Sequence, residues 1–358
     1  MPGKEKTSTN RHKVCIIGHF GGDKFFTDGQ TVKTKEIREL LLTSGYEVSS
    51  VDTYYLRKNP FSILRKIKKA FRNDDAIVLV VSMRGYSILS PLLARMNRRA
   101  KLKMFDFVIG GTRYKIFDKK SFYKNVAKSF TRIYVETDRI KREYFSRGVK
   151  NVEVIPNFKS IEKFPPKENY IKDGELHACT FSRVIKEKGI SDAIDAIKIA
   201  NNCGDGKKYY LDVFGKIDER YKDEFLEKVK KSDGVVKYGG ELKPDESSKI
   251  INHFDVLLFP TYWKSEGFPG TIIDALFAAV PIIATDWNDN FCILQPDVNA
   301  IKVNIMNPAD LAKAMQKIVD DKVFFLKMSS NNSILASKYS PEYAKKKILK
   351  DMEGAVHE

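Results

Sequence analysis

The chain has few residues of the kinds that mark disulfide-rich, metal-binding or membrane-spanning proteins. Its 358 residues include only four cysteines, and none stands at a Cys-x-x-Cys spacing or has a histidine at ligand spacing. No apolar run approaches the roughly 18 to 20 residues of a membrane-spanning helix, and the first residues, MPGKEKTSTNRHK, lack the apolar core of a signal peptide. We therefore expect a cytoplasmic protein with reduced cysteines.

Acidic residues are scarce in the first half of the chain. Residues 1–157 hold 33 Lys and Arg against 15 Asp and Glu, whereas the remainder holds 30 and 31. No Asp or Glu occurs between Asp52 and Asp74, or between Asp75 and Asp106. A net charge of +17 that comes from one half predicts a polyanionic partner for that half, either nucleic acid or an anionic membrane.

One basic segment has an amphipathic pattern. Residues 61–72, FSILRKIKKAFR, place five apolar side chains largely on one helix face and five Lys and Arg on the remainder. We expect this helix, with the basic residues 95–103, to dock on an anionic membrane surface; a solvated helix face is the alternative. RNP-like aromatics, a KH glycine loop and zinc spacing are all missing, so we expect no nucleic-acid partner.

Short apolar runs alternate with helical segments along the whole chain, which predicts parallel sheets in an α/β fold. The length suffices for two domains. The predicted strands are 13–18, 46–51, 76–82, 104–109, 133–136, 152–155, 176–181, 209–214, 235–238, 255–259, 281–284 and 300–303.

The stretch from Asp255 to Trp287 is the most informative. Its two apolar runs bracket a helical segment at about 271–279, and the loop before that helix is rich in small residues. Backbone amides at such a helix start suit a phosphate. Glu266 and Asp274 are eight positions apart, and we expect both to face one crevice. A plain β-α-β unit with a capping acid is the alternative.

The segment SEGFPGTIIDALFAAVPIIATDW resembles the signature of retaining glycosyltransferase family 4, whose members have the GT-B fold. The resemblance implies that Glu266 meets the donor sugar and that the second acid, here Asp274 in place of the family's Glu, holds the nucleotide ribose. SRVIKEKG resembles the family's Arg-x4-Lys-Gly pair, which implies that Arg183 and Lys188 grip the donor diphosphate. Their positive charge would stabilise a departing nucleoside diphosphate.

Other candidate binding residues lie in loops at the ends of predicted strands. The loop after residues 13–18 is glycine-rich but is neither Gly-x-Gly-x-x-Gly nor a Walker loop. The loop begins with His19. The simplest interpretation of this histidine is a surface residue at the end of a strand. Counterparts of these loops hold donor or acceptor in the resembled family. The candidates are Gly21, Gly22, Gln30, Thr31, Gly110, Gly111, Gly215, Tyr238, Gly240, Gly267, Phe268, Pro269, Gly270 and Thr271.

The resemblance also implies a domain organisation. It consists of two Rossmann-like parallel-sheet domains that face each other across a cleft. Residues 1–157 would form the acceptor-side domain and residues 158–338 the donor domain, with VIPNF as the link. Residues 339–358 would be a C-terminal helix that packs back on the first domain.

The function implied is that of a retaining glycosyltransferase, which moves a sugar from a nucleotide-sugar donor to a glycan or lipid-linked acceptor. No Asp-x-Asp metal motif occurs, so we expect no metal or other cofactor. The Gly110-Gly111 pair resembles members of bacterial surface-polysaccharide synthesis, which implies a capsule-type role at the inner face of the plasma membrane. Two alternatives stay open: a basic nucleic-acid-binding protein, and a GT-B enzyme that isomerises or phosphorolyses sugars.

Overall fold

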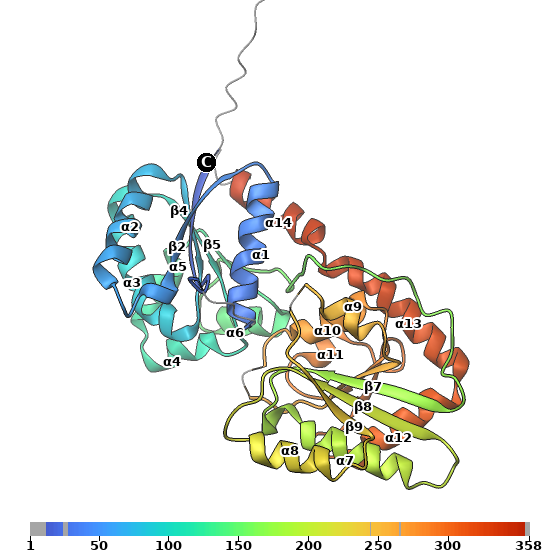
Figure 1. The fold of residues 1–358 in the computed structure, drawn as a ribbon. Coiled ribbons are helices and arrows are strands. Elements are labelled where there is room, and N and C mark those ends of the chain that lie inside the picture. The colour runs from blue at the N-terminus through green and yellow to red at the C-terminus, as the bar shows by residue number, and fades with distance from the viewer. Residues whose placement is uncertain (1–11, 24–27, 244, 265, 355–358) are drawn as a thin grey trace, which may run out of the picture. The chain divides into compact units, whose positions relative to one another are not determined.

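The computed structural model describes residues 12–23, 28–243, 245–264 and 266–354. The chain divides into two compact units (Figure 1). Unit 1 consists of Met1–Ile155 together with Ala344–Glu358, and unit 2 of Pro156–Tyr343. Each unit contains a six-stranded sheet in which all pairs are parallel. The predicted α/β class with two parallel sheets is confirmed.

The sheet of unit 1 has the strand order β2-β1-β3-β4-β5-β6. Its strands are β1 (Lys13–Gly18), β2 (Glu47–Asp52), β3 (Ala76–Val80), β4 (Lys103–Phe107), β5 (Arg132–Val135) and β6 (Val152–Val154). Every residue of β3 is buried, as is typical of a parallel strand covered on both faces.

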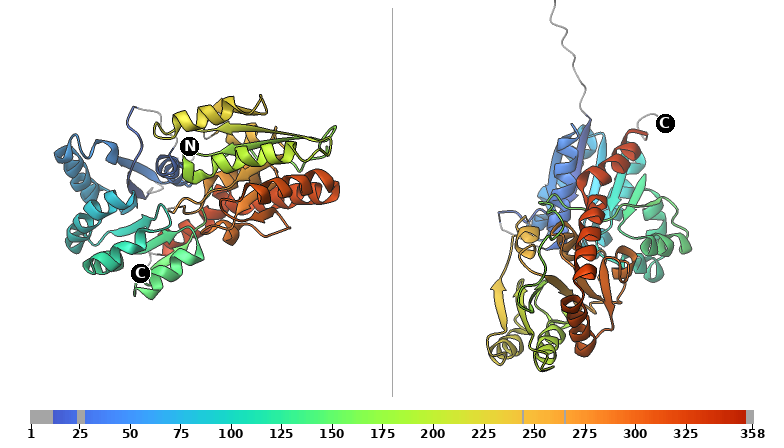
Figure 2. Two further views of the ribbon diagram at one scale, coloured as in Figure 1. Left: turned by 90° about the horizontal axis from the view of Figure 1, so that it is seen from below. Right: turned by 90° about the vertical axis from the view of Figure 1, so that its right-hand side faces the viewer.

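The α-helices of unit 1 cover both faces of this sheet (Figures 1 and 2). They are α1 (Gly29–Thr43), α2 (Pro60–Asn73), α3 (Met83–Ala100), α4 (Ile116–Lys119), α5 (Phe122–Lys128), α6 (Asp138–Ser146) and most of α14 (Pro341–Gly354). Short 3-10 turns are η1 (Thr53–Tyr55) and η2 (Arg113–Lys115). Asp351 of α14 accepts a hydrogen bond of 3.1 Å from the Tyr134 hydroxyl, which attaches the end of this helix to β5.

The sheet of unit 2 has the order β12-β11-β10-β7-β8-β9. Its strands are β7 (Glu175–Phe181), β8 (Lys208–Phe214), β9 (Val236–Gly240), β10 (Val256–Phe259), β11 (Ile282–Thr285) and β12 (Ala300–Val303). Its helices are α7 (Ile190–Asn201), α8 (Lys222–Lys230), α9 (Ser247–Ile251), α10 (Gly270–Phe277), α11 (Asn290–Ile293), α12 (Pro308–Asp320) and α13 (Lys322–Ala336), with the turns η3 (Lys186–Lys188) and η4 (Ser337–Tyr339).

Alternate residues of the unit 2 strands point to two separate apolar layers. Leu258 of β10 joins the layer under α7 and α12, whereas its neighbours Leu257 and Phe259 join the layer under α10. This alternation follows from the period of two in a strand. Both faces of the sheet are therefore buried, and its ligand-accessible parts are the loops at the strand ends.

Helix α2 has the apolar face that the sequence predicted. That face packs into the core of unit 1 and is not available to a membrane. Ile63 and Ile67 are at most 2% exposed and belong to that core, while Phe61 is 83% exposed. The cations Arg65, Lys66, Lys68, Lys69 and Arg72 are exposed. The helix thus offers a basic surface with a single exposed aromatic ring at its start.

Candidate functional site

The predicted donor residues of unit 2 gather where the order of the sheet reverses. The chain runs from β7 outward to β8 and β9, and then returns to the other side of β7 to form β10. Connections that leave two adjacent parallel strands in opposite directions open a crevice at the carboxyl ends of those strands. Arg183 and Lys188 follow β7, and Glu266 follows β10, so all three lie at this switch point.

Gly189 allows the two loops of this site to approach each other. It has φ +70°, and a Cβ at this position would lie 2.1 Å from the carbonyl oxygen of Pro260. The Tyr262 amide donates to the Glu187 carbonyl at 2.9 Å, which joins the same two loops. Because only glycine fits here, Lys188 is held against the segment after β10.

Lys188 and Glu266 form an ion pair. The Lys188 ammonium donates to Oε2 of Glu266, and both side chains are nearly buried, at 10% and 11% exposure. The buried Thr261 hydroxyl donates to the same oxygen at 3.2 Å. The structure therefore joins the residue predicted for the diphosphate to the residue predicted for the sugar.

Arg183 is exposed and contacts the same loop. Its guanidinium carbon is 5.3 Å from the centroid of the Trp263 ring, a cation-π contact. The Trp263 carbonyl accepts from the Trp287 indole at 2.9 Å and from the Glu266 amide at 3.1 Å. These contacts fix the loop that carries Glu266, and they leave an exposed cation above it.

The N-terminus of α10 opens at the same place. Its N-cap residue, Pro269, provides no side-chain hydrogen bond, and the first turn contains no acid. Gly270 and Thr271 are its first two residues, and the Thr271 hydroxyl donates to the Phe181 carbonyl at 2.6 Å, at the end of β7. An uncapped helix start carries partial positive charge and free amides, which suits the phosphate predicted for the loop from Gly267.

Asp274 lies deeper than the sequence suggested. Its carboxylate is 0% exposed and accepts from the Lys159 ammonium at 2.6 and 2.7 Å and from the Ser247 hydroxyl at 2.7 Å. Burial raises the pKa of Asp274, and Lys159 opposes that shift. The structure thus separates the two acids: Glu266 pairs with Lys188 and Asp274 with Lys159.

Other predicted residues of unit 2 have mainly structural surroundings. The Phe268 ring lies in the apolar layer, 5.3 Å from the Tyr339 ring. The Tyr238 hydroxyl donates to the Gly215 carbonyl at 3.0 Å, and the Gly215 amide donates to the Gly240 carbonyl at 2.8 Å. These bonds join the ends of β8 and β9 beside the site.

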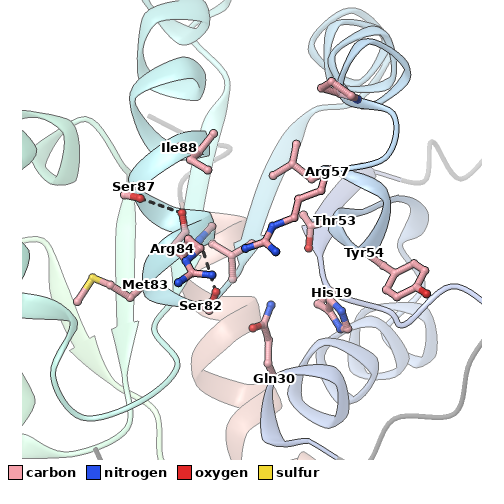
Figure 3. A pocket seen from close by; sticks show the side chains of 14 residues that line it. His19, Gln30, Thr53, Tyr54, Arg57, Ser82, Met83, Arg84, Ser87 and Ile88 are labelled. Atoms are coloured by element: carbon pink, nitrogen blue, oxygen red, sulfur yellow. Dashed lines mark hydrogen bonds between the residues drawn. The ribbon is translucent and has the colours of Figure 1, made fainter.

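Unit 1 has a switch point of its own, between β1 and β3. A pocket of about 1020 Å³ lies there, lined by residues just after β1, β2 and β3 and by the first residues of α1, α2 and α3 (Figure 3). We call it the unit 1 pocket. Gln30 is the one predicted binding residue among the described residues of its lining. Other lining residues include His19, Arg57, Ser82 and Arg84.

The glycine loop before this pocket is held by Asp52, a residue that the sequence motifs do not mark. Its carboxylate accepts from the amides of Phe20, Gly22 and Tyr54 at 2.7 to 2.9 Å. Gly21 and Gly22 both have positive φ. An acid directly after a strand and opposite a glycine loop is the signal that could have found Asp52.

Thr31 connects the pocket wall to the cap of α1. Its hydroxyl donates to Asp28 at 2.7 Å and lies 2.8 Å from Nδ1 of His19. Because the hydroxyl proton goes to Asp28, Nδ1 is the donor to Thr31. This fixes both the ring orientation and the tautomer of His19.

Gly110 and Gly111 follow β4. Gly110 has φ +81° and open space around its Cα, and the Gly111 carbonyl accepts from Arg139 at 3.5 Å. The nearby Arg113 is buried. It donates to Asp106 at 2.8 and 3.0 Å and to the carbonyl of Val81, a residue that lines the unit 1 pocket.

Two kinds of feature are missing from the residues that the structure describes. No group of three or more His, Cys, Asp or Glu side chains in that part of the chain is arranged to hold a metal ion. None of the helices described is both long and apolar enough to span a membrane.

Comparison with known proteins gives a family match over most of unit 2. Residues 176–321 match the model of the family described as glycosyl transferases group 1. No curated protein sequence was found to match the chain. The matched segment contains Arg183, Lys188, Glu266 and Asp274, so the candidate site lies inside the part of the chain that is similar to glycosyl transferases group 1.

Solved structures show the same fold over nearly the whole chain. Anabaena HepE in complex with UDP aligns at TM-score 0.71 with 14% identity, over 96% of this chain and 100% of its own. Sucrose-phosphate synthase from Thermosynechococcus elongatus aligns at TM-score 0.75 with 15% identity, over 97% and 100%. The lipopolysaccharide outer core galactosyltransferase WaaB, in its apo form, aligns at TM-score 0.65 with 14% identity, over 96% and 99%. The two sheets with their helices thus form the GT-B fold, as the sequence predicted.

Proposed function

We propose that the chain is a retaining glycosyltransferase that uses a nucleotide sugar, with the donor bound at the switch point of unit 2. The observation that carries this proposal is the arrangement of Arg183, Lys188 and Glu266 inside the segment that matches glycosyl transferases group 1. The solved structures of HepE with UDP and with UDP-glucose support a uridine nucleotide as the first donor to test.

The ion pair gives the site a specific way to bind its donor. The donor diphosphate replaces Glu266 as the partner of Lys188, and the sugar hydroxyls replace Lys188 as the partners of Glu266. Both charges are therefore already desolvated and oriented before the donor arrives. A ligand that offers both an anionic diphosphate and sugar hydroxyls satisfies both groups, whereas either part alone leaves one of them unpaired.

The reaction then needs little from the protein beyond positioning and charge. The bond between the anomeric carbon and the diphosphate oxygen breaks, and the acceptor oxygen bonds to that carbon on the same face. The acceptor proton passes to the leaving phosphate oxygen. Arg183, Lys188 and the amides at the start of α10 stabilise the charge that develops on the diphosphate, so no metal is required.

Glu266→Gln tests the assignment most directly. The substitution keeps the shape of the side chain but removes the charge from the sugar side of the site. We expect turnover to fall by about 10²-fold or more, while UDP binds at least as tightly as to wild type in calorimetry, because UDP alone no longer has to break the ion pair with Lys188. Glu187→Gln, which alters an exposed acid in the neighbouring turn, is the control and should behave as wild type. Equal losses of UDP affinity and turnover in Glu266→Gln would refute the sugar assignment.

Asp274 is proposed as the ribose ligand on the resemblance alone, and its burial demands a sharper test. For the carboxylate to reach a ribose, its pair with Lys159 must open. If Asp274 binds the ribose hydroxyls, wild type should prefer UDP to 2′,3′-dideoxy-UDP, and Asp274→Asn should lose that preference. If both nucleotides bind equally to the wild type, Asp274 only anchors α10 to Lys159.

The acceptor is proposed to be a glycan or a lipid-linked saccharide of surface-polysaccharide synthesis, reached from the cytoplasmic face of a membrane. The exposed cations of α2 and the exposed Phe61 support this placement. Each cation near an anionic surface contributes about 1 kcal/mol. Reversal of Lys66, Lys68, Lys69 and Arg72 to Glu should release the protein from anionic liposomes and leave donor hydrolysis unchanged. Wild-type protein that ignores such liposomes at physiological salt would contradict the membrane placement.

A further inference from the structure

We propose that the unit 1 pocket binds a phosphate group of the acceptor, which makes the acceptor a phosphorylated saccharide or a saccharide diphosphate. The inference rests on the proposed function only in that it identifies the bound phosphate compound as the acceptor. The recognition of phosphate follows from the pocket itself.

The charges in the pocket wall are the first argument. Arg57 and Arg84 extend into the pocket from opposite walls (Figure 3), and no Asp or Glu belongs to its lining. Neither guanidinium has an ion pair or a side-chain hydrogen bond within the part of the chain that the structure describes. Guanidinium groups present planar N–H donors that match phosphate oxygens, and two unopposed ones attract an anion.

The helix starts are the second argument. The first residues of α1, α2 and α3 all contribute to the lining. The carboxylate of Asp28 caps α1, whereas α2 and α3 have neutral N-caps and no acid in their first turns. The N-cap of α3 is Ser82, a neutral residue whose hydroxyl accepts from the Gly85 amide at 3.5 Å. Helix α3 has 18 residues, so its start carries the partial positive charge of a full helix.

The rim of the pocket is the third argument, because its side chains suit the group to which the phosphate is attached. Ile88 lines the pocket and is 56% exposed, and Met83 is 36% exposed. Pro60 is the first residue of α2 and precedes the exposed Phe61. The polar side chain of His19 lies on another wall, in a position that is fixed through Thr31. A pocket with cations inside and both apolar and polar side chains around them accommodates a phosphate that is attached to either a lipid or a sugar.

Calorimetry with saturating UDP separates this pocket from the donor site. We would titrate inorganic pyrophosphate, glucose 1-phosphate and geranyl diphosphate into the full-length chain, with methyl glucoside as the neutral probe. Arg57→Gln/Arg84→Gln should bind the phosphates about 10- to 100-fold more weakly, since charge-assisted hydrogen bonds are lost. Lys119→Gln/Lys120→Gln removes the same charge from an exposed turn elsewhere in unit 1 and should bind as wild type.

The source of the phosphate and the validity of the proposal follow from the same titrations. Tighter binding of geranyl diphosphate identifies a lipid-linked acceptor, and tighter binding of glucose 1-phosphate identifies a soluble one. Failure of all three phosphates to bind wild type overturns the proposal, and so does equal weakening in the two double variants. If the phosphates bind as expected but no nucleotide sugar supports transfer, the proposed function fails and the phosphate pocket stands.

Discussion

Both units have cations at the point where the strand order of the sheet reverses. They differ in whether an acidic side chain neutralises those cations. In unit 2, Lys188 is paired with Glu266, and Lys159 is paired with Asp274. In unit 1, Arg57 and Arg84 reach into the pocket without an acid in its lining. Both arrangements lie where the strand order reverses, between β7 and β10 and between β1 and β3.

This difference implies two modes of ligand selection. In the proposed mode of binding, a ligand of unit 2 exchanges with an internal ion pair, so it has to satisfy a cation and an anion at once. A ligand of unit 1 only has to bring negative charge, and its affinity should therefore fall more steeply with salt. Strict selection fits the proposed donor, and selection by charge fits the proposed acceptor.

The largest effects should come from breaking the buried ion pair of each unit. Arg113→Met leaves Asp106 buried without its cation, and Lys159→Met does the same to Asp274. Each should lower the free energy of unfolding by about 3–5 kcal/mol, as measured by urea denaturation followed by circular dichroism. Arg147→Met, which removes a partly exposed partner of Asp118, should cost at most about 1 kcal/mol.

The pH dependence of the Arg113→Met variant adds a second check. Burial raises the pKa of Asp106. The folded variant therefore binds a proton at a higher pH than its unfolded chain does, and its stability relative to wild type should increase as the pH falls. A deficit that stays constant with pH would show that lost packing, and not an uncompensated charge, destabilises the variant.

The next effect concerns the cations of unit 2. Arg183→Ala and Lys188→Ala should each lower turnover by about 10²- to 10³-fold, because in the proposed reaction each is a preorganised partner of the leaving diphosphate. Lys186→Ala, which removes an exposed lysine of the same turn, is the matched control. Activity of the wild type should survive excess EDTA. Complete loss that manganese or magnesium restores would mean that a metal, and not these residues, carries the charge.

A smaller difference in stability is expected between alanine substitutions of two glycines, one in each unit. Gly189→Ala and Gly110→Ala both force a left-handed residue, at a cost of about 1–2 kcal/mol. Gly189→Ala also pushes a methyl group into the Pro260 carbonyl, which adds about 1–3 kcal/mol and should weaken UDP binding, whereas the site of Gly110 is open. Thermal melts and UDP calorimetry measure both effects. Equal damage from the two variants would show that backbone strain alone matters.

The last effect is a pH dependence and concerns Lys33, a buried lysine of α1 in the basic unit. Burial lowers its pKa to about 8. Below pH 8 the residue is protonated in both states, whereas between pH 8 and its ordinary value of 10.5 the folded state releases the proton first. Wild-type stability should therefore rise through this window relative to Lys33→Met. Parallel pH profiles of the two proteins would contradict the shift.

The fold could be predicted because its signals are local. Buried parallel strands are short apolar runs, and the helices between them carry their own caps and periodicity. The strand predicted at 300–303 is β12 itself, and most other boundaries lie within two residues. The loop that carries Glu266 could be predicted for the same reason, because its residues all lie in one contiguous segment, Asp255 to Trp287.

The partners within the site could not be predicted from such signals. Lys188 and Glu266 are 78 positions apart, and Lys159 and Asp274 are 115 apart, so only the folded sheet brings each pair together. No motif marks Lys159, which follows the link between the units. Phe268 stands in a loop of the predicted site, yet its ring packs into the core, because the sequence shows that a loop exists but not which side its aromatic faces.

The tryptophans of the chain have a practical consequence. Only two occur, Trp263 and Trp287, and they are joined by a hydrogen bond beneath Arg183. Intrinsic indole emission therefore arises only from the loop that carries Glu266 and from the residue bonded to it. A donor that draws the Arg183 guanidinium away from the Trp263 ring changes the local electric field at that fluorophore. The native chain thus contains its own optical sensor for occupancy of the unit 2 site, without any label.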